Sequence, residues 1–163
     1  MNRRRIVVSI KSQKAFLYEG SALLKSYTVS TGKNGIGCVP GSNCTPTGLH
    51  RIAQKIGDGL PLRAELKGRV PTGRIWSPSP ENPLANSEDD LILTRILWLE
   101  GCEPNNATTF ERYIYFHGTN QEHLLGTPVS HGCIRMSNAD IIELFDLVEV
   151  GTEVAILTHE GQF

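Results

Sequence analysis

Two nearby stretches of the chain hold the side chains that nucleophilic catalysis needs. Residues 113–119 read Y-I-Y-F-H-G-T, and residues 130–135 read S-H-G-C-I-R. His117 in the first stretch precedes Cys133 in the second by 16 positions. A cysteine with an ordinary pKa near 8.5 is only about 3% thiolate at pH 7, and a neighbouring imidazole can take its proton or, as imidazolium, favour the thiolate. The residue types and spacing therefore predict a nucleophile at Cys133 and a base at His117.

The residues next to this pair suit the same chemistry. Gly132 lets the backbone turn tightly before Cys133 and lets a substrate approach the neighbouring N–H groups, which can form an oxyanion hole. In the first stretch, the period of a strand places Tyr113, Tyr115 and His117 on one face, with the two apolar residues between them on the other. The pattern predicts a rigidly held histidine that reaches a cleft.

Other interpretations of the same residues stay open at this point. Cys133 can be a buried small apolar residue, and His117 can be a core histidine with satisfied hydrogen bonds. A zinc site formed with His131 is a further possibility, but no Cys-x-x-Cys or His-x-x-x-His spacing supports it. We therefore expect no metal, and the incomplete glycine pattern at residues 35–37 predicts no nucleotide cofactor.

Composition limits the class of protein. The chain has 163 residues, 39% hydrophobic and 20% charged, which is typical of one globular domain spanning residues 1–163. Its 16 Lys and Arg residues against 17 Asp and Glu residues give a net charge of -1. We expect neither nucleic acid nor a membrane as a partner, and composition does not indicate an oligomeric state.

The N-terminus lacks the features of an export signal. A short basic run is followed by the apolar residues 6–10, and polar residues follow at once, without a longer apolar stretch or a small-residue cleavage site. We expect a cytoplasmic protein. Cys38, Cys44 and Cys102 are then expected to be reduced thiols, with a redox pair between Cys38 and Cys44 as the alternative.

Short strands separated by turn residues dominate the rest of the pattern, so the predicted fold class is mainly β. One helix is expected after the cysteine motif, capped by Ser137 and ending near Gly151. Residues Thr72–Asp90 are rich in Pro, Ser and Asn and predict a long surface loop. The predicted strands are Ile6–Ile10, Lys14–Glu19, Leu24–Ser30, Leu49–Lys55, Leu91–Leu99, Arg112–His117 and Glu153–Thr158.

At the His-Gly and Ser-His-Gly-Cys-Ile-Arg blocks the sequence resembles the catalytic domain of the L,D-transpeptidase (YkuD) family. Residues 27–32, reading Y-T-V-S-T-G, and residues 45–48, reading T-P-T-G, look like two further segments of that family. The resemblance covers essentially the whole chain, although the spacer of residues 118–129 is short for the family. It implies an L,D-transpeptidase-type β-sandwich.

The resemblance also implies roles for particular residues. Cys133 would be acylated by a peptidoglycan stem tetrapeptide, with His117 as the base, the carbonyl of Gly118 orienting the ring, and the Gly132 and Cys133 N–H groups binding the oxyanion. Arg135 would contact a substrate carboxylate. Further expected substrate contacts, with structural packing as the alternative for His131 and Trp98, are Ser130, His131, Tyr115 and Trp98.

Three functions are consistent with these observations. The first, which we favour, is a cytoplasmic L,D-carboxypeptidase that trims tetrapeptides to tripeptides during peptidoglycan recycling. The second is a periplasmic L,D-transpeptidase that forms cross-links or exchanges D-amino acids. The third is a peptidoglycan-binding module without catalysis, which the intact His117 and Cys133 pair argues against. The expected partners are muropeptides with tetrapeptide stems.

Overall fold

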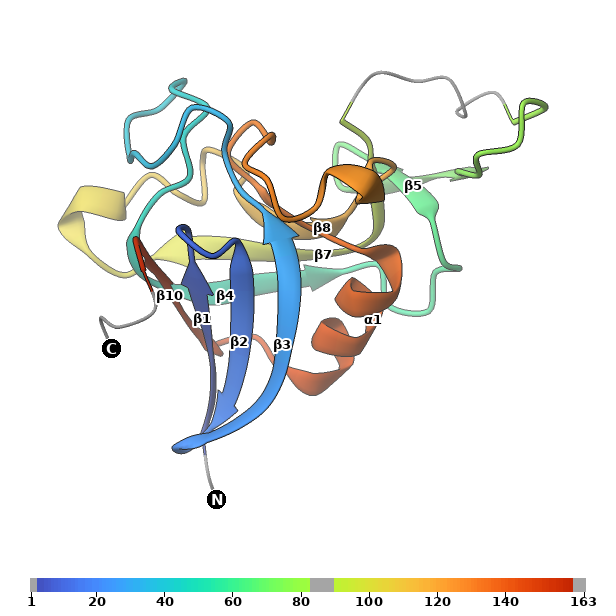
Figure 1. Cartoon of the computed structure of the whole chain (residues 1–163). Helices are drawn as coiled ribbons and strands as arrows, with labels where there is room; N and C mark the ends of the chain where they lie inside the picture. The colour runs from blue at the N-terminus through green and yellow to red at the C-terminus, as the bar shows by residue number, and fades with distance from the viewer. Residues whose placement is uncertain (1–2, 83–89, 160–163) are drawn as a thin grey trace.

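The computed structural model describes residues 3–82 and 90–159, in which strands predominate (Figure 1). Two short 3-10 turns at Pro104–Asn106 and Glu122–Leu124 and one α-helix, α1 (Asn138–Leu147), accompany them. The strands are β1 (Arg4–Ser9), β2 (Lys14–Glu19), β3 (Ala22–Ser30), β4 (Gly48–Ile56), β5 (Ala64–Lys67), β6 (Val70–Ile75), β7 (Ile92–Gly101), β8 (Tyr115–Gly118), β9 (Ile134–Met136) and β10 (Glu153–Leu157).

The sheet closes on itself. Its strand order is β4-β10-β1-β2-β3-β9-β8-β7-β5-β6, and β4 also pairs with β7. The β5–β6 hairpin pairs with the beginning of β7, on the edge of β7 opposite β8. The predicted mainly β architecture is confirmed, and hydrogen bonding between strands is continuous from β4 round to β7.

The helix follows from its cap and its apolar spacing. The Ser137 hydroxyl accepts a hydrogen bond from the Asp140 N–H at 3.1 Å, as the sequence predicts. Ile141, Leu144 and Phe145 are buried against the sheet, where α1 contacts β7 and β8. The helix ends at Leu147, earlier than predicted. The chain from residue 148 is extended and turns at a glycine into β10.

The alternation along β8 and β9 separates the core from the site. Ile114, Phe116 and Ile134 belong to the main hydrophobic cluster, together with the apolar face of α1. Residues of the opposite parity, including Tyr115 and Cys133, contact a second, smaller cluster with Leu66, Ile96 and Trp98. The same two short strands therefore supply part of the core on one face and the candidate site on the other.

The predicted strands are all present, with boundaries that shift by a few residues, but three strands were not predicted. β5, β6 and β9 are short, and pairing with neighbours rather than local sequence defines them. β6 occupies the start of the predicted loop Thr72–Asp90, which was wrong for those residues, and residues 83–89 lie outside the described part of the chain. The prediction that a strand begins at Arg112 was also wrong, because Arg112 and Tyr113 close turns.

Within residues 3–82 and 90–159, no helix is both long and apolar enough to cross a bilayer. All four cysteines, Cys38, Cys44, Cys102 and Cys133, are free thiols.

Candidate active site

The Cys133 thiol lies between two backbone groups of the segment that leads into β8. It donates a hydrogen bond to the Tyr113 carbonyl, with the sulfur and oxygen 3.2 Å apart, and accepts one from the Tyr115 N–H at 3.4 Å. Tyr113 holds its carbonyl in this place with a left-handed backbone, φ 58°. Such a conformation is costly for a tyrosine and recurs at functional sites.

The surroundings of Cys133 favour the neutral thiol. Burial raises the pKa of Cys133 to about 12, and the charge of Asp90 adds to that rise. The Tyr115 N–H bond and the cations Arg135 and Arg112 lower the pKa, but by less than burial raises it. The thiol is therefore protonated at neutral pH in this arrangement.

His117 is buried, with 1% of its surface exposed, and its two ring nitrogens differ. Nδ1 lies 2.6 Å from the Gly118 carbonyl oxygen, so it carries the hydrogen and donates it. Nε2 has no hydrogen-bond partner among the described residues. Burial lowers the pKa of His117, whereas Asp90 raises it by less. The ring is therefore neutral, with a free lone pair on Nε2, and the orienting contact expected of Gly118 is present.

His117 lies on β8, and Cys133 directly precedes β9, which pairs in parallel with β8. His117 pairs in register with Arg135, and Phe116 with Ile134, so Cys133 and His117 face the same side. The thiol is bonded to Tyr113 rather than to the imidazole. The sequence-based expectation of a thiolate favoured by imidazolium is therefore not met at rest.

The loop before Cys133 is fixed by Ser130, which is fully buried. Its hydroxyl accepts a hydrogen bond from the Gly132 N–H at 3.1 Å and donates one to the Cys133 carbonyl at 2.6 Å. Ser130 thus holds the loop from inside the protein, and the Gly132 N–H already has a hydrogen-bond partner in this arrangement. The predicted substrate contact of Ser130 and the predicted oxyanion donors, Gly132 and Cys133, stay predictions.

Gly132 has to be glycine for two reasons. Its φ of 117° is a conformation that other residues rarely adopt, and a Cβ there would lie 3.0 Å from the Cys44 carbonyl oxygen. Arg112 holds that neighbouring loop by donating to the carbonyls of Cys44 at 2.6 Å and Gly37 at 3.1 Å. The residues around Cys44 therefore form a wall of the site, which sequence reasoning did not foresee.

Thr45 is a second residue that sequence reasoning did not assign to the site. It is fully buried, donates to the Gly132 carbonyl at 2.9 Å and accepts from the Gly32 N–H at 2.8 Å. The T-P-T-G and V-S-T-G segments thus brace the cysteine loop from one side. Their similarity to the family was the signal that could have located them.

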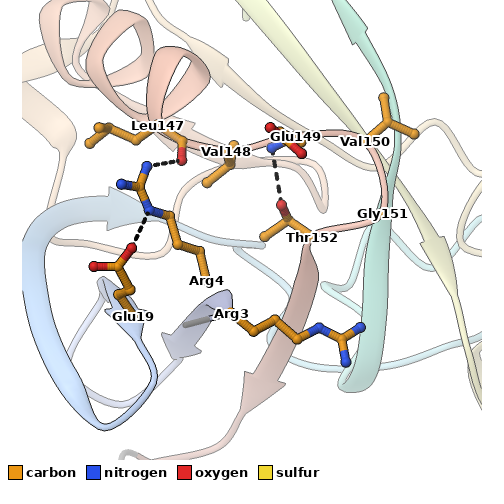
Figure 2. Close-up of a pocket in the computed structure, with 9 residues that line it drawn as sticks. All are labelled: Arg3, Arg4, Glu19, Leu147, Val148, Glu149, Val150, Gly151 and Thr152. Carbon is orange, nitrogen blue, oxygen red and sulfur yellow. Dashed lines mark hydrogen bonds and ion pairs between the residues drawn. The ribbon is translucent and has the colours of Figure 1, made fainter. Parts of the chain in front are cut away.

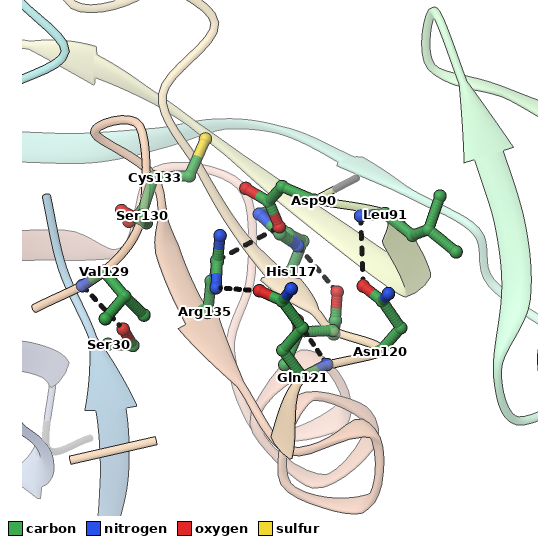
Figure 3. A network of polar contacts seen from close by, with 12 residues as sticks. Ser30, Asp90, Leu91, His117, Asn120, Gln121, Val129, Ser130, Cys133 and Arg135 are labelled. Carbon is green, nitrogen blue, oxygen red and sulfur yellow. Dashed lines mark hydrogen bonds and ion pairs between the residues drawn. The ribbon is translucent and has the colours of Figure 1, made fainter. Parts of the chain in front are cut away.

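A network of charged and polar groups lies beside His117 (Figure 3). Arg135, 3% exposed, has its Nε 3.0 Å from Asp90 Oδ1 and donates from Nη1 to Gln121 at 2.8 Å. Its guanidinium is therefore already engaged inside the protein. For Arg135 to bind a substrate carboxylate, as the sequence predicts, the ion pair with Asp90 would have to open.

The remaining predicted contacts lie in different environments. Trp98 and Tyr115 are buried, at 8% and 3% exposure, and their rings meet edge to face at 5.5 Å. Trp98 also stacks on Phe110 at 4.0 Å, so the packing alternative describes it better than a groove lining does. His131 is exposed to solvent next to the cysteine loop. Its predicted substrate contact stays a prediction.

Two further features bear on the chemistry. Among the described residues, no group of three or more His, Cys, Asp or Glu is placed to hold a metal ion. A surface hollow lies away from Cys133, lined by Arg3, Arg4, Glu19 and residues 147–152 (Figure 2). Arg4 bridges Glu19 and the Leu147 carbonyl there. None of the predicted site residues lines this hollow.

The sequence of the chain is similar to those of known proteins. The chain is 30% identical over 137 residues to the putative L,D-transpeptidase YqjB of Bacillus subtilis, covering 84% of this chain and 61% of that protein. It is 28% identical to the putative L,D-transpeptidase YkuD of Bacillus licheniformis, covering 93% and 90%. The chain thus spans about three fifths of YqjB.

Solved structures show the same fold. L,D-transpeptidase 3 from Mycobacterium tuberculosis, in complex with a faropenem-derived adduct, superposes with a TM-score of 0.59 at 16% identity, covering 96% of this chain and 60% of that one. The family model for the YkuD L,D-transpeptidase catalytic domain matches residues 3–156. The chain therefore belongs to the L,D-transpeptidase (YkuD) family.

Proposed function

We propose that the chain is a cysteine acyltransferase that cleaves the bond before the terminal D-Ala of peptidoglycan stem tetrapeptides. The observation that carries the proposal is the protonation state of His117. Its Nδ1 hydrogen is held by the Gly118 carbonyl, which leaves Nε2 free to accept a proton on the face that Cys133 shares. Membership of the family supports the class of substrate.

Acylation begins when the thiol turns from the Tyr113 carbonyl and gives its proton to His117 Nε2. The sulfur attacks the carbonyl carbon of the third residue, and the Cys133 N–H stabilises the resulting oxyanion. When the C–N bond breaks, the imidazolium returns the proton to the amine. D-Ala leaves, and the rest of the stem stays as a thioester on Cys133.

We propose water as the main acceptor, so that the products are tripeptide and D-Ala. His117 would take a proton from water, and hydroxide addition would release the tripeptide carboxylate and restore the thiol. The position of Cys133 supports this preference. The residue is only partly exposed, with Tyr113 and Tyr115 against its sulfur, and water needs less room there than a second peptide stem.

The deciding measurement is a product analysis. Purified protein is incubated with a defined tetrapeptide, with and without an added D-amino acid. The products are separated by chromatography and identified by mass spectrometry. We expect tripeptide and D-Ala in both cases, with exchanged tetrapeptide as a minor product. A majority of exchanged or cross-linked product would instead support an L,D-transpeptidase, the activity for which the relatives are named.

We also propose a cytoplasmic location, where soluble muropeptides are the available substrates. Fractionation of cells that make the untagged protein tests it, with a cytoplasmic and a periplasmic marker protein measured in the same fractions. Recovery with the periplasmic marker would contradict the recycling role but leave the acyl-transfer chemistry intact. Binding of muropeptides without any turnover would support the non-catalytic alternative.

A further inference from the structure

The β5–β6 hairpin presents an arginine to the site from an unusual backbone. The hairpin turns at Gly68 and Arg69, whose φ angles are 55° and 65°. Both values belong to the left-handed region that two-residue hairpin turns require and that glycine or asparagine normally occupies. An arginine there is conformationally unfavourable, so the local turn does not explain its presence.

The guanidinium of Arg69 packs on two aromatic side chains, and one of them, Trp98, belongs to the cluster that Cys133 contacts. Its central carbon is 5.1 Å from the ring centre of Trp98 and 4.7 Å from that of Tyr113. One of its N–H groups donates to the Tyr115 hydroxyl at 3.2 Å. The same two tyrosines make the backbone contacts to the Cys133 sulfur. Arg69 is thus bound by the side chains of two tyrosines whose backbone groups contact the Cys133 sulfur.

Arg69 differs in what it binds from Arg74 on the same hairpin and from Arg135 beside His117. On the same hairpin, Arg74 forms an ion pair with the buried Glu65 at 2.8 Å, and Arg135 is paired with Asp90. Within residues 3–82 and 90–159, no carboxylate forms an ion pair with Arg69. A guanidinium has five N–H donors in a planar fork that fits a carboxylate, and the Tyr115 hydroxyl occupies one of them.

We propose that Arg69 binds the C-terminal carboxylate of the substrate, on the residue that leaves. The aromatic rings hold the guanidinium flat, and its free N–H groups meet the carboxylate as the scissile carbonyl reaches Cys133. This places a specificity residue on the hairpin, outside the His-Gly and Ser-His-Gly-Cys blocks. The identity of the substrate in this proposal rests on the proposed function. The attraction of an anion by Arg69 does not.

The first test uses alkylating agents and requires no peptidoglycan. Iodoacetate and iodoacetamide have nearly the same size and both alkylate a cysteine sulfur with loss of iodide, but only iodoacetate carries a carboxylate. The two rates are measured at Cys133 by mass spectrometry of its peptide, with the exposed Cys102 of the same molecules as internal reference. The variants are Arg69→Asn, which suits the left-handed turn, and Arg69→Lys, which keeps the charge.

We expect the ratio of iodoacetate to iodoacetamide rates to be higher at Cys133 than at Cys102. Arg69→Asn lowers that ratio about tenfold, as expected for loss of one nearby charge, and Arg69→Lys restores part of it. Lys67→Asn is the matched control, because it removes an exposed cation from the same hairpin and should leave the ratio unchanged. Equal changes in both rates in Arg69→Asn would show that Arg69 only packs the aromatic rings, and would overturn the proposal.

The second test uses a tetrapeptide with a free C-terminal carboxylate and the same peptide as its C-terminal amide. The wild-type protein should prefer the free acid, and Arg69→Asn should raise KM for the acid about tenfold, with a smaller change for the amide. If neither peptide is cleaved while the alkylation ratio depends on Arg69, the proposed function fails and the anion site stands. If wild type and Arg69→Asn cleave the acid and the amide with the same KM, the anion site fails and the proposed function stands.

Discussion

The two faces of the β8–β9 strand pair bury different kinds of side chain. On the core face, Phe116, Ile134 and Met136 are fully buried in one apolar cluster. On the site face, His117 has a buried nitrogen without a partner among the described residues, and the thiol of Cys133 is held neutral by burial. The strand alternation thus lets a stable core position groups that are individually unfavourable where they lie.

The site face is expected to matter for chemistry and little for stability. Cys133→Ala removes the nucleophile and should lower tetrapeptide turnover by at least ~10⁴-fold, while the melting temperature changes by no more than about 4 °C. Turnover by product analysis and thermal unfolding by circular dichroism measure the two effects. Cys38→Ala and Cys102→Ala are the controls and should stay active. Full activity in Cys133→Ala would contradict the assignment of the chemistry to the site face.

Reaction with a strained β-lactam tests whether Cys133 is the reactive thiol. A carbapenem offers an activated carbonyl to the thiol, so one covalent adduct per chain is expected on Cys133 and none on Cys133→Ala. Intact-protein mass spectrometry reports the adduct, and peptide mapping reports its position. An adduct on Cys38, Cys44 or Cys102 alone would assign the reactive thiol to another part of the molecule.

The core face should show the reverse behaviour. Phe116→Ala leaves a cavity in the main cluster and should lower the free energy of unfolding by about 3–5 kcal/mol. Urea unfolding measures the loss. At a temperature where the variant is still folded, its alkylation at Cys133 should differ little from wild type. A loss of stability below about 1 kcal/mol would mean that this face does not carry the core.

Two buried histidines give the stability a pH dependence with a defined sign. Burial lowers the pKa of His50 and of His117 below the ordinary value of 6.5, so the unfolded chain takes up protons that the folded chain resists. Stability is therefore greatest above pH 6.5 and falls as the pH decreases from there. Each histidine adds up to about 1.4 kcal/mol per pH unit to that slope.

His50→Gln separates the two contributions, because His50 lies outside the active site and bonds to Gly48 and Thr109. Urea unfolding between pH 5 and pH 8 should show a smaller slope in this variant than in wild type. At the alkaline end, the raised pKa of Cys133 predicts a loss of stability as the pH rises above 9, and Cys133→Ala should reduce that loss. An unchanged acid slope in His50→Gln would contradict the first assignment.

Local sequence was sufficient for the groups that one strand or one cap determines. The His117 strand end, the Ser137 cap and the parity of Phe116 all follow from residue type and period. The partners that come from distant segments could not be predicted. Asp90 ends a stretch without periodicity, and it meets Arg135 only because β7, β8 and β9 lie side by side.

Arg69 illustrates the same limit. Its sequence context is an ordinary turn, and its contacts with Tyr113 and Trp98 exist only once β5 pairs with β7. The hydrogen bond that occupies the Gly132 N–H could not be predicted for a related reason. The Ser130 hydroxyl is only two residues away, and which of its neighbours it bonds depends on a side-chain rotation that sequence does not determine.

The closure of the sheet has a consequence for self-association. Because β4 pairs with β7, β6 is the strand that ends the order, and one of its sides has no partner strand in the described sheet. Such an edge is where another molecule can add a strand and begin aggregation. β6 carries Pro71, which has no N–H to offer, and its residues are exposed rather than forming a flat apolar ribbon. The hairpin that carries Arg69 therefore also carries an obstacle to strand addition at its free edge.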